Sequence, residues 1–406
     1  MSTLPAVERS ELESVQRWSL IVGGAALTIC VIGAFFSPAQ FFRAYLGAYL
    51  WCLGTALGCM VLLMLYHVTG GAWGFVLRRS YEAAMRTLPL MAALFVPIAA
   101  GVRYLYPWVD PAIVGSGGEL KFNHTYLNVP FFYFRAVLYF AAWILISFIL
   151  STWSRRQDRV GEIGSPRKFR LLSAPSMAVY GLTITFASVD WTMSTQPEFH
   201  STMWGPLFAA GQILSGQAFV VVVLGWLASR PPLRDVVSRD VLNDIGNLLF
   251  SFLVIWAYMA FFQFMLVWMA NLREEAAWYL PRVAGGWRAL AWSLFLLHFA
   301  VPFFALLMRE VKRSPQALMR VAALILFMRL VGLYWEILPA YPDQGLAQHW
   351  MDFVAPVGVG GIWLSAFLWL LKQNPVLPQH DPSQLEALRL RERDEEEARR
   401  EAMHHG

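Results

Sequence analysis

Residues 45–66 read YLGAYLWCLGTALGCMVLLMLY, an apolar run without a single charged residue. A helix needs about 20 predominantly apolar residues to cross the hydrocarbon core of a bilayer, so this run is long enough to span a membrane. Small residues recur in it at Gly47, Gly54 and Gly58, and small residues let a second helix approach closely. The stretch therefore predicts a membrane-spanning helix that packs tightly against its neighbours.

Nine further apolar runs of similar length surround this one. The chain of 406 residues is 57% hydrophobic and 15% charged, whereas soluble domains carry about 25% charged residues. The first run is too long for the apolar region of a cleavable signal peptide. We therefore expect an all-α polytopic membrane protein with about ten transmembrane helices, at 18–36, 45–66, 87–105, 130–153, 171–191, 205–228, 242–268, 287–308, 317–338 and 350–371.

The distribution of Lys and Arg predicts the orientation of these helices. If the N-terminus is cytoplasmic, 24 of the 32 basic residues fall on the inner side and 6 on the outer side, with Arg135 and Arg329 inside spans. Cytoplasmic loops of membrane proteins carry an excess of Lys and Arg. The asymmetry predicts that both termini are cytoplasmic. An even number of helices is consistent with this, because it places the two termini on the same side of the membrane.

Three regions follow from this pattern: a cytoplasmic N-terminal segment at 1–17, a transmembrane domain at 18–371 and a charged cytoplasmic tail at 372–406. Pro375, Pro378 and Pro382 predict a stiff linker, and 383–403 predicts a solvated helix because acidic and basic residues alternate at helical spacing. The positive charge follows membrane topology and forms no basic face, so we expect lipids as partners and no nucleic acid.

Polar residues inside the predicted spans are the candidate functional residues, because charges in a membrane are costly and usually face the protein interior or water. Most belong to the outer half of the membrane, whereas His298 lies near the midplane and Asp244 and Asn247 open the seventh helix at its inner end. They form either structural ion pairs or a proton-carrying or quinone-facing cluster. The outer set consists of Arg135, Asp190, Gln212, Arg329 and Glu336.

Cofactor ligands are scarce in this sequence. Cys30, Cys52 and Cys59 fall inside apolar runs and no Cys-x-x-Cys motif occurs, which argues against iron–sulfur clusters and c-type haem. A b-type haem normally needs two facing histidines, and only His298 lies deep in a predicted span. We expect this chain to bind no metal or haem.

Four stretches resemble one family: 70–74 (GGAWG), 126–132 (YLNVPFF) leading to Arg135, 188–194 (SVDWTMS) and 243–247 (NDIGN). They are similar to the large membrane subunits of bacterial alternative complex III, a quinol:electron-acceptor oxidoreductase, within the wider NrfD/PsrC-like family. The length and the Gly-Gly-x-Trp-Gly loop look more like the ActF type than the ActC type. The resemblance covers roughly residues 40–370 and includes Pro197, Ser201, Thr202, Trp256, Ala257, Tyr258, Gln263, Phe264 and Asn271.

The resemblance implies a fold, a location and partners. It implies two four-helix bundles, helices 2–5 at 45–191 and 6–9 at 205–338, with the first and last helices peripheral. It also implies a place in the bacterial inner membrane beside an ActC-type membrane subunit, an iron–sulfur subunit and haem c subunits. In that family the ActC-type subunit oxidises quinol at its outer side, and the ActF-type subunit has no established redox cofactor and is discussed as a scaffold and proton route. A quinone or menaquinone is the one cofactor that this chain is expected to be able to contact.

Three functions are compatible with these features. The first is a cofactor-free subunit, not itself redox-catalytic, that offers a polar path for protons. The second is the quinol-binding subunit, with Asp190 or Glu336 accepting the proton of the quinol. No outer-half histidine matches an ActC-type quinol site, because His124 and His200 fall in loops. The third is a stand-alone proton-coupled transporter; against it, the sequence shows no obvious broken helices at matching positions in two halves.

Overall fold

The structure is a computed structural model that describes residues 6–110, 124–160, 166–341 and 349–404. Within these ranges the chain is helical and contains no strand. Ten of the described helical segments are long and apolar enough to cross a membrane, so the chain is a multi-pass helical membrane protein. These segments are Ser10–Ala34, Pro38–Thr69, Ala72–Ala100, Val129–Arg159, Arg167–Thr195, Trp204–Leu227, Arg239–Ala270, Trp287–Leu307, Pro315–Ala340 and Trp350–Leu371.

Two helices form the centre of the array: α2 (Pro38–Thr69) and α10 (Trp204–Leu227). In α2, 89% of the most apolar window is buried, and in α10 the share is 78%. The two backbones touch, since a Cβ added to Gly58 would lie only 1.9 Å from the carbonyl oxygen of Gln212. Glycine is required at this crossing because any side chain would separate the helices.

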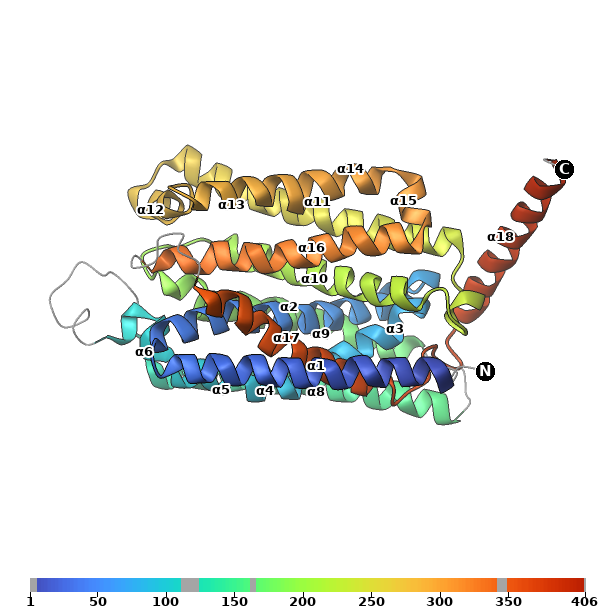
Figure 1. Cartoon of the computed structure of the whole chain (residues 1–406), viewed down its shortest axis with the longest axis horizontal. Helices are drawn as coiled ribbons and strands as arrows, with labels where there is room; N and C mark the ends of the chain where they lie inside the picture. Colours follow the sequence, from blue (N-terminus) through green and yellow to red (C-terminus); the bar gives the residue numbers. More distant parts are fainter. Residues whose placement is uncertain (1–5, 111–123, 161–165, 342–348, 405–406) are drawn as a thin grey trace.

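Helices on either side of this pair complete the array (Figure 1). On one side, α2 contacts α3 (Ala72–Met85), α9 (Pro166–Trp191) and α17 (Trp350–Leu371), and α8 (Val129–Val160) packs on α9. On the other side, α10 contacts α16 (Pro315–Ile337) and α11 (Arg239–Ala270). Direct contact between α2 and α10 joins the two sides.

The first and last spanning helices pair with each other. In this pair, α1 (Ala6–Ala34) runs along α17, and a Cβ on Gly23 would lie 2.7 Å from the backbone nitrogen of Ile362. Only 22% of the apolar window of α1 is buried. This helix is therefore held by a glycine contact to α17 and presents most of its surface outward.

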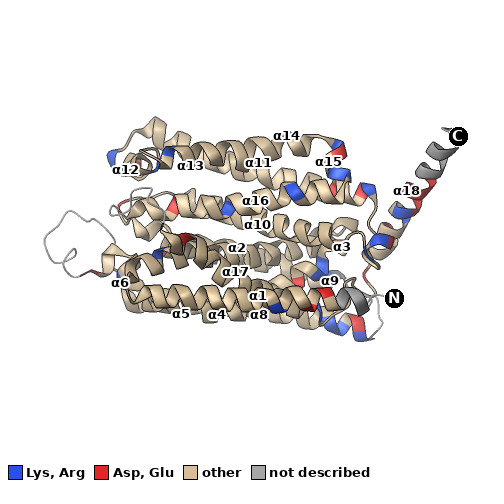
Figure 2. Ribbon diagram, viewed as in Figure 1, with Lys and Arg blue, Asp and Glu red and all other residues tan. Residues whose placement is uncertain are grey.

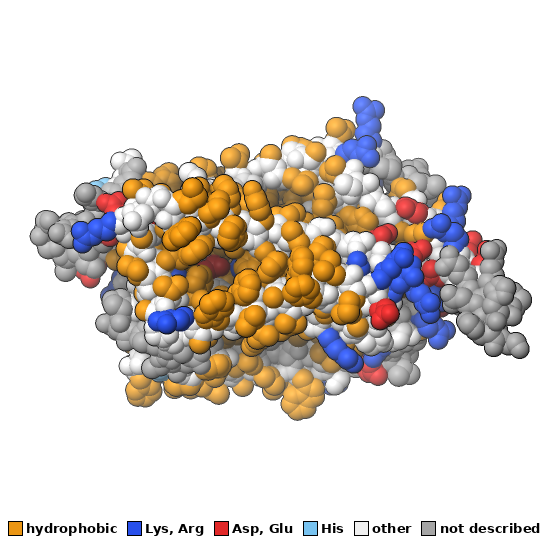
Figure 3. Space-filling model, turned by 90° about the horizontal axis from the view of Figure 1, so that it is seen from above, with side chains coloured by type: hydrophobic (Ala, Val, Ile, Leu, Met, Phe, Trp, Pro, Cys, Tyr) orange, Lys and Arg blue, Asp and Glu red, His pale blue; other side chains and the backbone are white. Residues whose placement is uncertain are grey.

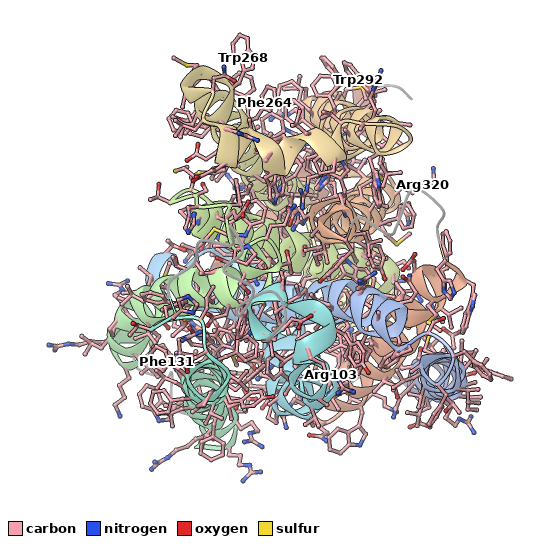
Figure 4. The ribbon with its side chains drawn as sticks, turned by 90° about the vertical axis from the view of Figure 1, so that its left-hand side faces the viewer. Arg103, Phe131, Phe264, Trp268, Trp292 and Arg320 are labelled. Atoms are coloured by element: carbon pink, nitrogen blue, oxygen red, sulfur yellow. The ribbon has the colours of Figure 1, made fainter. Side chains whose placement is uncertain are left out.

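The opposite edge of the array is also loosely covered. It consists of α11 and of a continuous segment made of α13 (Trp287–Ser293), the π-helical turn η4 (Leu294–Ala300) and α14 (Val301–Leu307). The buried share of the apolar window is 22% in α11 and 17% in 287–307. Figure 3 shows this face covered by hydrophobic side chains, and Trp268 and Trp292 extend outward in Figure 4. Such a surface suits contact with hydrocarbon.

Short helices connect these spans. After α3 the third span continues through α4 (Leu88–Leu94) and α5 (Val96–Ala100) into α6 (Val102–Leu105) and η1 (Pro107–Val109). The remaining connections are η2 (Met193–Thr195), η3 (Leu233–Asp235), α12 (Arg273–Arg282), α15 (Arg309–Arg313) and η5 (Leu338–Ala340).

The predicted start of the third span, at residue 87, is wrong. The helix begins at Ala72, so the segment expected to be an inner loop is helical and carries Arg78 and Arg79, which are 2% and 3% exposed. The hydropathy pattern missed this helix because its charged side chains pair inside the protein.

The first part of the tail packs against the body of the protein, and the helix that follows extends away from it. Val376, Leu377 and Asp381 of the proline-containing linker are buried, and α18 (Gln384–His404) then extends away from the array (Figure 1). Both ends of the described chain lie at the same end of the array, where charged side chains also concentrate (Figure 2). We call this the termini end, and the end with α6 and α12 the opposite end.

Candidate functional site

A buried network of charged side chains lies at the termini end. Arg78 donates from Nε to Glu82 Oε1 at 2.9 Å and from Nη1 to Asp381 Oδ2 at 2.5 Å. Arg79 donates to Glu82 Oε2 at 2.6 Å and also pairs with Asp158 of α8. We call these five residues the inner network. Its two guanidinium groups are matched by three carboxylates, which offsets the cost of taking them out of water.

Local sequence explains why α3 delivers these arginines to the interior. Gly70 and Gly71 have φ values of +73° and +107°, a backbone conformation that glycine adopts readily, and they turn the chain sharply from α2 into α3. A Cβ on Gly74 would lie 1.9 Å from the ring of Tyr66, so glycine also lets α3 pack against α2. The 70–74 motif is thus a packing turn that orients Arg78 and Arg79 toward α8 and the tail.

A row of buried polar side chains leads from this network toward the opposite end. Tyr81, between the arginines and Glu82 on α3, donates its hydroxyl to Gln217 Oε1 at 2.6 Å. Five residues away on α10, about 7.5 Å of helix rise, Gln212 Oε1 accepts a hydrogen bond of 2.8 Å from Tyr180 of α9. All four side chains are buried.

The row continues onto α16 through a glycine. A Cβ on Gly211 would lie 2.7 Å from Arg329 Nη2, so the guanidinium of Arg329 occupies the space beside α10 next to Gln212. Arg329 Nη1 then lies 3.5 Å from Glu336 Oε1. We call Tyr81, Gln217, Tyr180, Gln212, Arg329 and Glu336 the polar row.

A second arginine lies at the opposite end of the row, and the sequence did not single it out. Arg282 of α12 is fully buried, with its guanidinium carbon 3.5 Å from the centroid of the Trp278 ring, and it donates to the backbone oxygen of Glu336 at 2.6 Å. Burial lowers the pKa of Arg282 to about 9, and the Glu336 carboxylate opposes this shift. The spacing of Trp278 and Arg282, one helical turn, is the signal that could have identified it.

Arg135 and Asp190 form a separate ion pair between α8 and α9. Arg135 donates from Nε and Nη2 to the two carboxylate oxygens at 2.8 and 2.7 Å, and Tyr139 donates to Oδ2 at 2.9 Å. Arg135 Nη1 also donates to the backbone oxygen of Tyr126 at 2.8 Å. The pair therefore joins two helices to the segment that precedes α8.

His298 lies in the π-helical turn η4 and is fully buried. Its ring centroid is 4.0 Å from that of Trp256 on α11, and neither ring nitrogen has a hydrogen-bond partner among the described residues. π-Helical turns are frequent at functional sites. An unsatisfied buried imidazole costs free energy, so this turn marks a place where a polar partner would stabilise the fold.

The structure brings together only part of the predicted set. The inward orientation expected of Arg135, Asp190 and Arg329 is observed, since each is at most 5% exposed, and the Glu336 side chain is 12% exposed. Asp244 and Asn247 do not join them, because both are exposed on α11 and Asn247 accepts a hydrogen bond from Lys312 at 2.7 Å.

The cysteines and histidines of the described residues do not cluster. Cys30, Cys52 and Cys59 are buried free thiols, and no three side chains of the His, Cys, Asp and Glu types gather as a metal site in the part of the chain that the structure describes. Comparison with protein-family models gives no match, and comparison with curated proteins gives none either.

Proposed function

We propose that the chain is an integral subunit of a bacterial inner-membrane quinol:electron-acceptor oxidoreductase of the alternative complex III kind, corresponding to the ActF type. In this proposal its redox partners carry the haem c groups and iron–sulfur clusters, and an ActC-type subunit binds the quinol. The resemblance of 70–74, 126–132, 188–194 and 243–247 to that family supports the assignment. The contribution of this chain is a path for protons.

The polar row is the observation that carries the proposed path. It runs from Tyr81, beside the inner network, to Glu336 near the opposite end, and its two glutamines lie on α10, one of the two most buried helices of the array. The amide nitrogens of Gln217 and Gln212 have no hydrogen-bond partner among the described residues. Since a buried unsatisfied amide costs about 1–3 kcal/mol, we expect ordered water to link these groups and to complete a hydrogen-bonded chain.

Glu336 is the proton-holding group in this proposal. Arg329 cannot release a proton at physiological pH, so it acts by electrostatics: it stabilises the ionised carboxylate, which lies 3.5 Å away. A proton that reaches Glu336 weakens this pairing, and loss of the proton restores it. Glu336 exchanges its proton with the outer aqueous phase in this proposal, and the 12% exposure of its side chain supports that step.

The Arg135–Asp190 pair has a different role in this proposal. Both carboxylate oxygens of Asp190 accept hydrogen bonds from Arg135, and Oδ2 accepts a third from Tyr139. These hydrogen bonds fix the carboxylate between α8 and α9, with both of its oxygens engaged by donors of the protein. This observation favours a structural pair over the quinol-binding alternative for Asp190.

The proposed topology places the termini end in the cytoplasm. The excess of Lys and Arg on the segments that lie there supports this orientation, with the inner network at the proton entry. Helices 2–5 and 6–9 would then form two bundles that meet at α2 and α10, with the α1–α17 pair at the periphery. This arrangement puts the row at the junction of the two bundles, because it passes from α3 and α9 through α10 to α16.

Two measurements test the proposal. Purification in mild detergent should isolate the chain with haem and iron–sulfur partners, whereas a stand-alone transporter would isolate alone. In vesicles containing the assembled complex, Gln217→Leu should lower the number of protons translocated per electron at an unchanged subunit composition. Asp244→Asn, an exposed position outside the row, is the matched control. An unchanged ratio in Gln217→Leu would remove the row from the mechanism.

A further inference from the structure

A long apolar groove lies on the surface between the α1–α17 pair and α16. Its volume is about 1210 Å³, and its floor contains Cys52 of α2, Phe219 of α10 and Phe367 of α17, all buried. Its rims are exposed, with Trp18 at 64% and Phe327 at 59%. The groove is therefore open along its side, toward the hydrocarbon of the membrane.

The groove has the height of a membrane. Its lining runs from Met319 on α16 to Leu338 at the start of η5, a rise of about 28 Å at 1.5 Å per residue, and the hydrocarbon core of a bilayer is about 30 Å thick. Two polar side chains in its wall bond within the protein: Trp51 Nε1 donates to the backbone oxygen of Leu326 at 3.0 Å, and Thr55 donates to that of Trp51 at 2.8 Å. The wall thus favours an apolar occupant over its full length.

The two ends of the groove differ in charge. Arg320 is exposed at the termini end of α16 and precedes the lining residue Phe327 by seven residues, so both lie on the same face of the helix. Figure 4 shows Arg320 extending outward from the protein. At the other end of the groove lies the carboxylate of Asp352, which accepts hydrogen bonds from Gln40 and from the backbone of His349.

We propose that this groove is a binding site for one phospholipid with an anionic headgroup. Its acyl chains would occupy the half of the groove nearer the termini end, because a phospholipid spans one leaflet, about half of the hydrocarbon core, and its phosphate would contact Arg320, because the carboxylate of Asp352 repels an anion at the other end. Basic residues at the cytoplasmic ends of helices recognise such headgroups. A partner helix fits less well, since close helix packing uses small residues and the rims carry Trp18, Phe327 and Phe353. This proposal is independent of the proton path.

The test is native mass spectrometry of the full chain in nanodiscs of phosphatidylglycerol or phosphatidylcholine. We expect phosphatidylglycerol to remain bound after release from the nanodisc, and Arg320→Glu to weaken its retention about tenfold. Arg309→Glu, an exposed position on α15 outside the groove, is the matched control and should behave as the parent chain. Gly360→Phe fills the groove from α17, where a Cβ meets only Trp51 at 3.4 Å, and should abolish retention.

Three results would overturn the proposal. The first is equal retention of the two lipids by the parent chain. The second is equal loss of phosphatidylglycerol in Arg320→Glu and Arg309→Glu. The third is a protein helix or a quinone occupying the groove in a density map of the complex. The thermal unfolding of each variant shows that it has folded, so loss of lipid through misfolding is distinguished from loss of the site.

Discussion

Arg78 and Asp381, 303 positions apart in the chain, meet as a buried ion pair in which Arg78 Nη1 donates to Asp381 Oδ2 at 2.5 Å. Asp381 Oδ1 also accepts a hydrogen bond of 2.7 Å from Tyr66 of α2. The tail linker is thus part of the folded body, and α18 is anchored through it. Removal of Asp381 takes one of its two carboxylate partners from Arg78, and removal of Arg78 leaves Asp381 buried without a cation; breaking a buried pair in this way is strongly destabilising.

Asp381→Asn should therefore lower the stability of the purified chain. We expect a loss of about 3 kcal/mol, because Arg78 keeps Glu82 but loses its second carboxylate, and thermal unfolding in detergent measures the change. Glu392→Gln, at an exposed position on α18, is the control and should leave the unfolding temperature unchanged. Equal stability of the two variants would show that the tail is not anchored by this pair.

The Arg135–Asp190 pair predicts a repairable defect. Asp190→Asn leaves the Arg135 charge buried and unpaired, so the yield of folded protein should fall, with a cost of about 3–5 kcal/mol. The double variant Arg135→Met/Asp190→Leu should recover much of the yield, because apolar replacement of a whole buried pair is often tolerated. If the double variant folds but the complex loses quinol oxidation, the pair acts in catalysis and its structural assignment is wrong.

The glycine crossing of α2 and α10 predicts a contrast between two glycines. Gly58→Ala places a methyl group 1.9 Å from the Gln212 carbonyl oxygen, so the helices must separate, at a cost of about 1–3 kcal/mol. Gly181→Ala on α9 meets no atom within 4 Å and should leave stability unchanged or raise it by up to about 1 kcal/mol. The unfolding temperatures of the two variants in detergent measure this contrast. Similar temperatures for Gly58→Ala and Gly181→Ala would mean that α2 and α10 are not close-packed at their crossing.

Topology can be tested with reporters at two positions. A reporter fused after Gly406 should be active only in its cytoplasmic form, and one fused after Asn271, at the end of α11 away from the termini end, only in its periplasmic form. The charge asymmetry is the reason for both expectations. Periplasmic activity after Gly406 would mean that the orientation is the reverse of the proposed one, because both ends of the described chain lie at the same end of the array.

The sequence predicts the number of spanning helices well because each buried or lipid-facing span is a long apolar run. It fails at α3, where Arg78, Arg79 and Glu82 look like a polar loop. Their partners, Asp158 and Asp381, come from distant parts of the chain, so no local pattern could reveal that these charges are neutralised inside the protein.

The residues of the candidate site also divide into those that the sequence reveals and those that only contacts between helices reveal. Intramembrane charges are visible in the sequence because they interrupt apolar runs, and Arg135, Asp190 and Arg329 are buried as such residues should be. Tyr81, Gln217 and Tyr180 carry no charge, so no sequence pattern marks them; only contacts between helices bring them together. Asp244 is a candidate because it opens a helix, but the structure exposes it on α11.

The central claim is that the polar row carries protons and that Glu336 holds them. The direct measurement is the number of protons translocated per electron by the complex in sealed vesicles, with Glu336→Gln compared with the parent and with Asp244→Asn. Glu336→Gln keeps the shape of the side chain and an amide oxygen that can accept a hydrogen bond from Arg329, but it cannot ionise, so we expect an assembled complex that oxidises quinol with a lower proton-to-electron ratio. An unchanged ratio in a fully assembled Glu336→Gln complex would contradict the account.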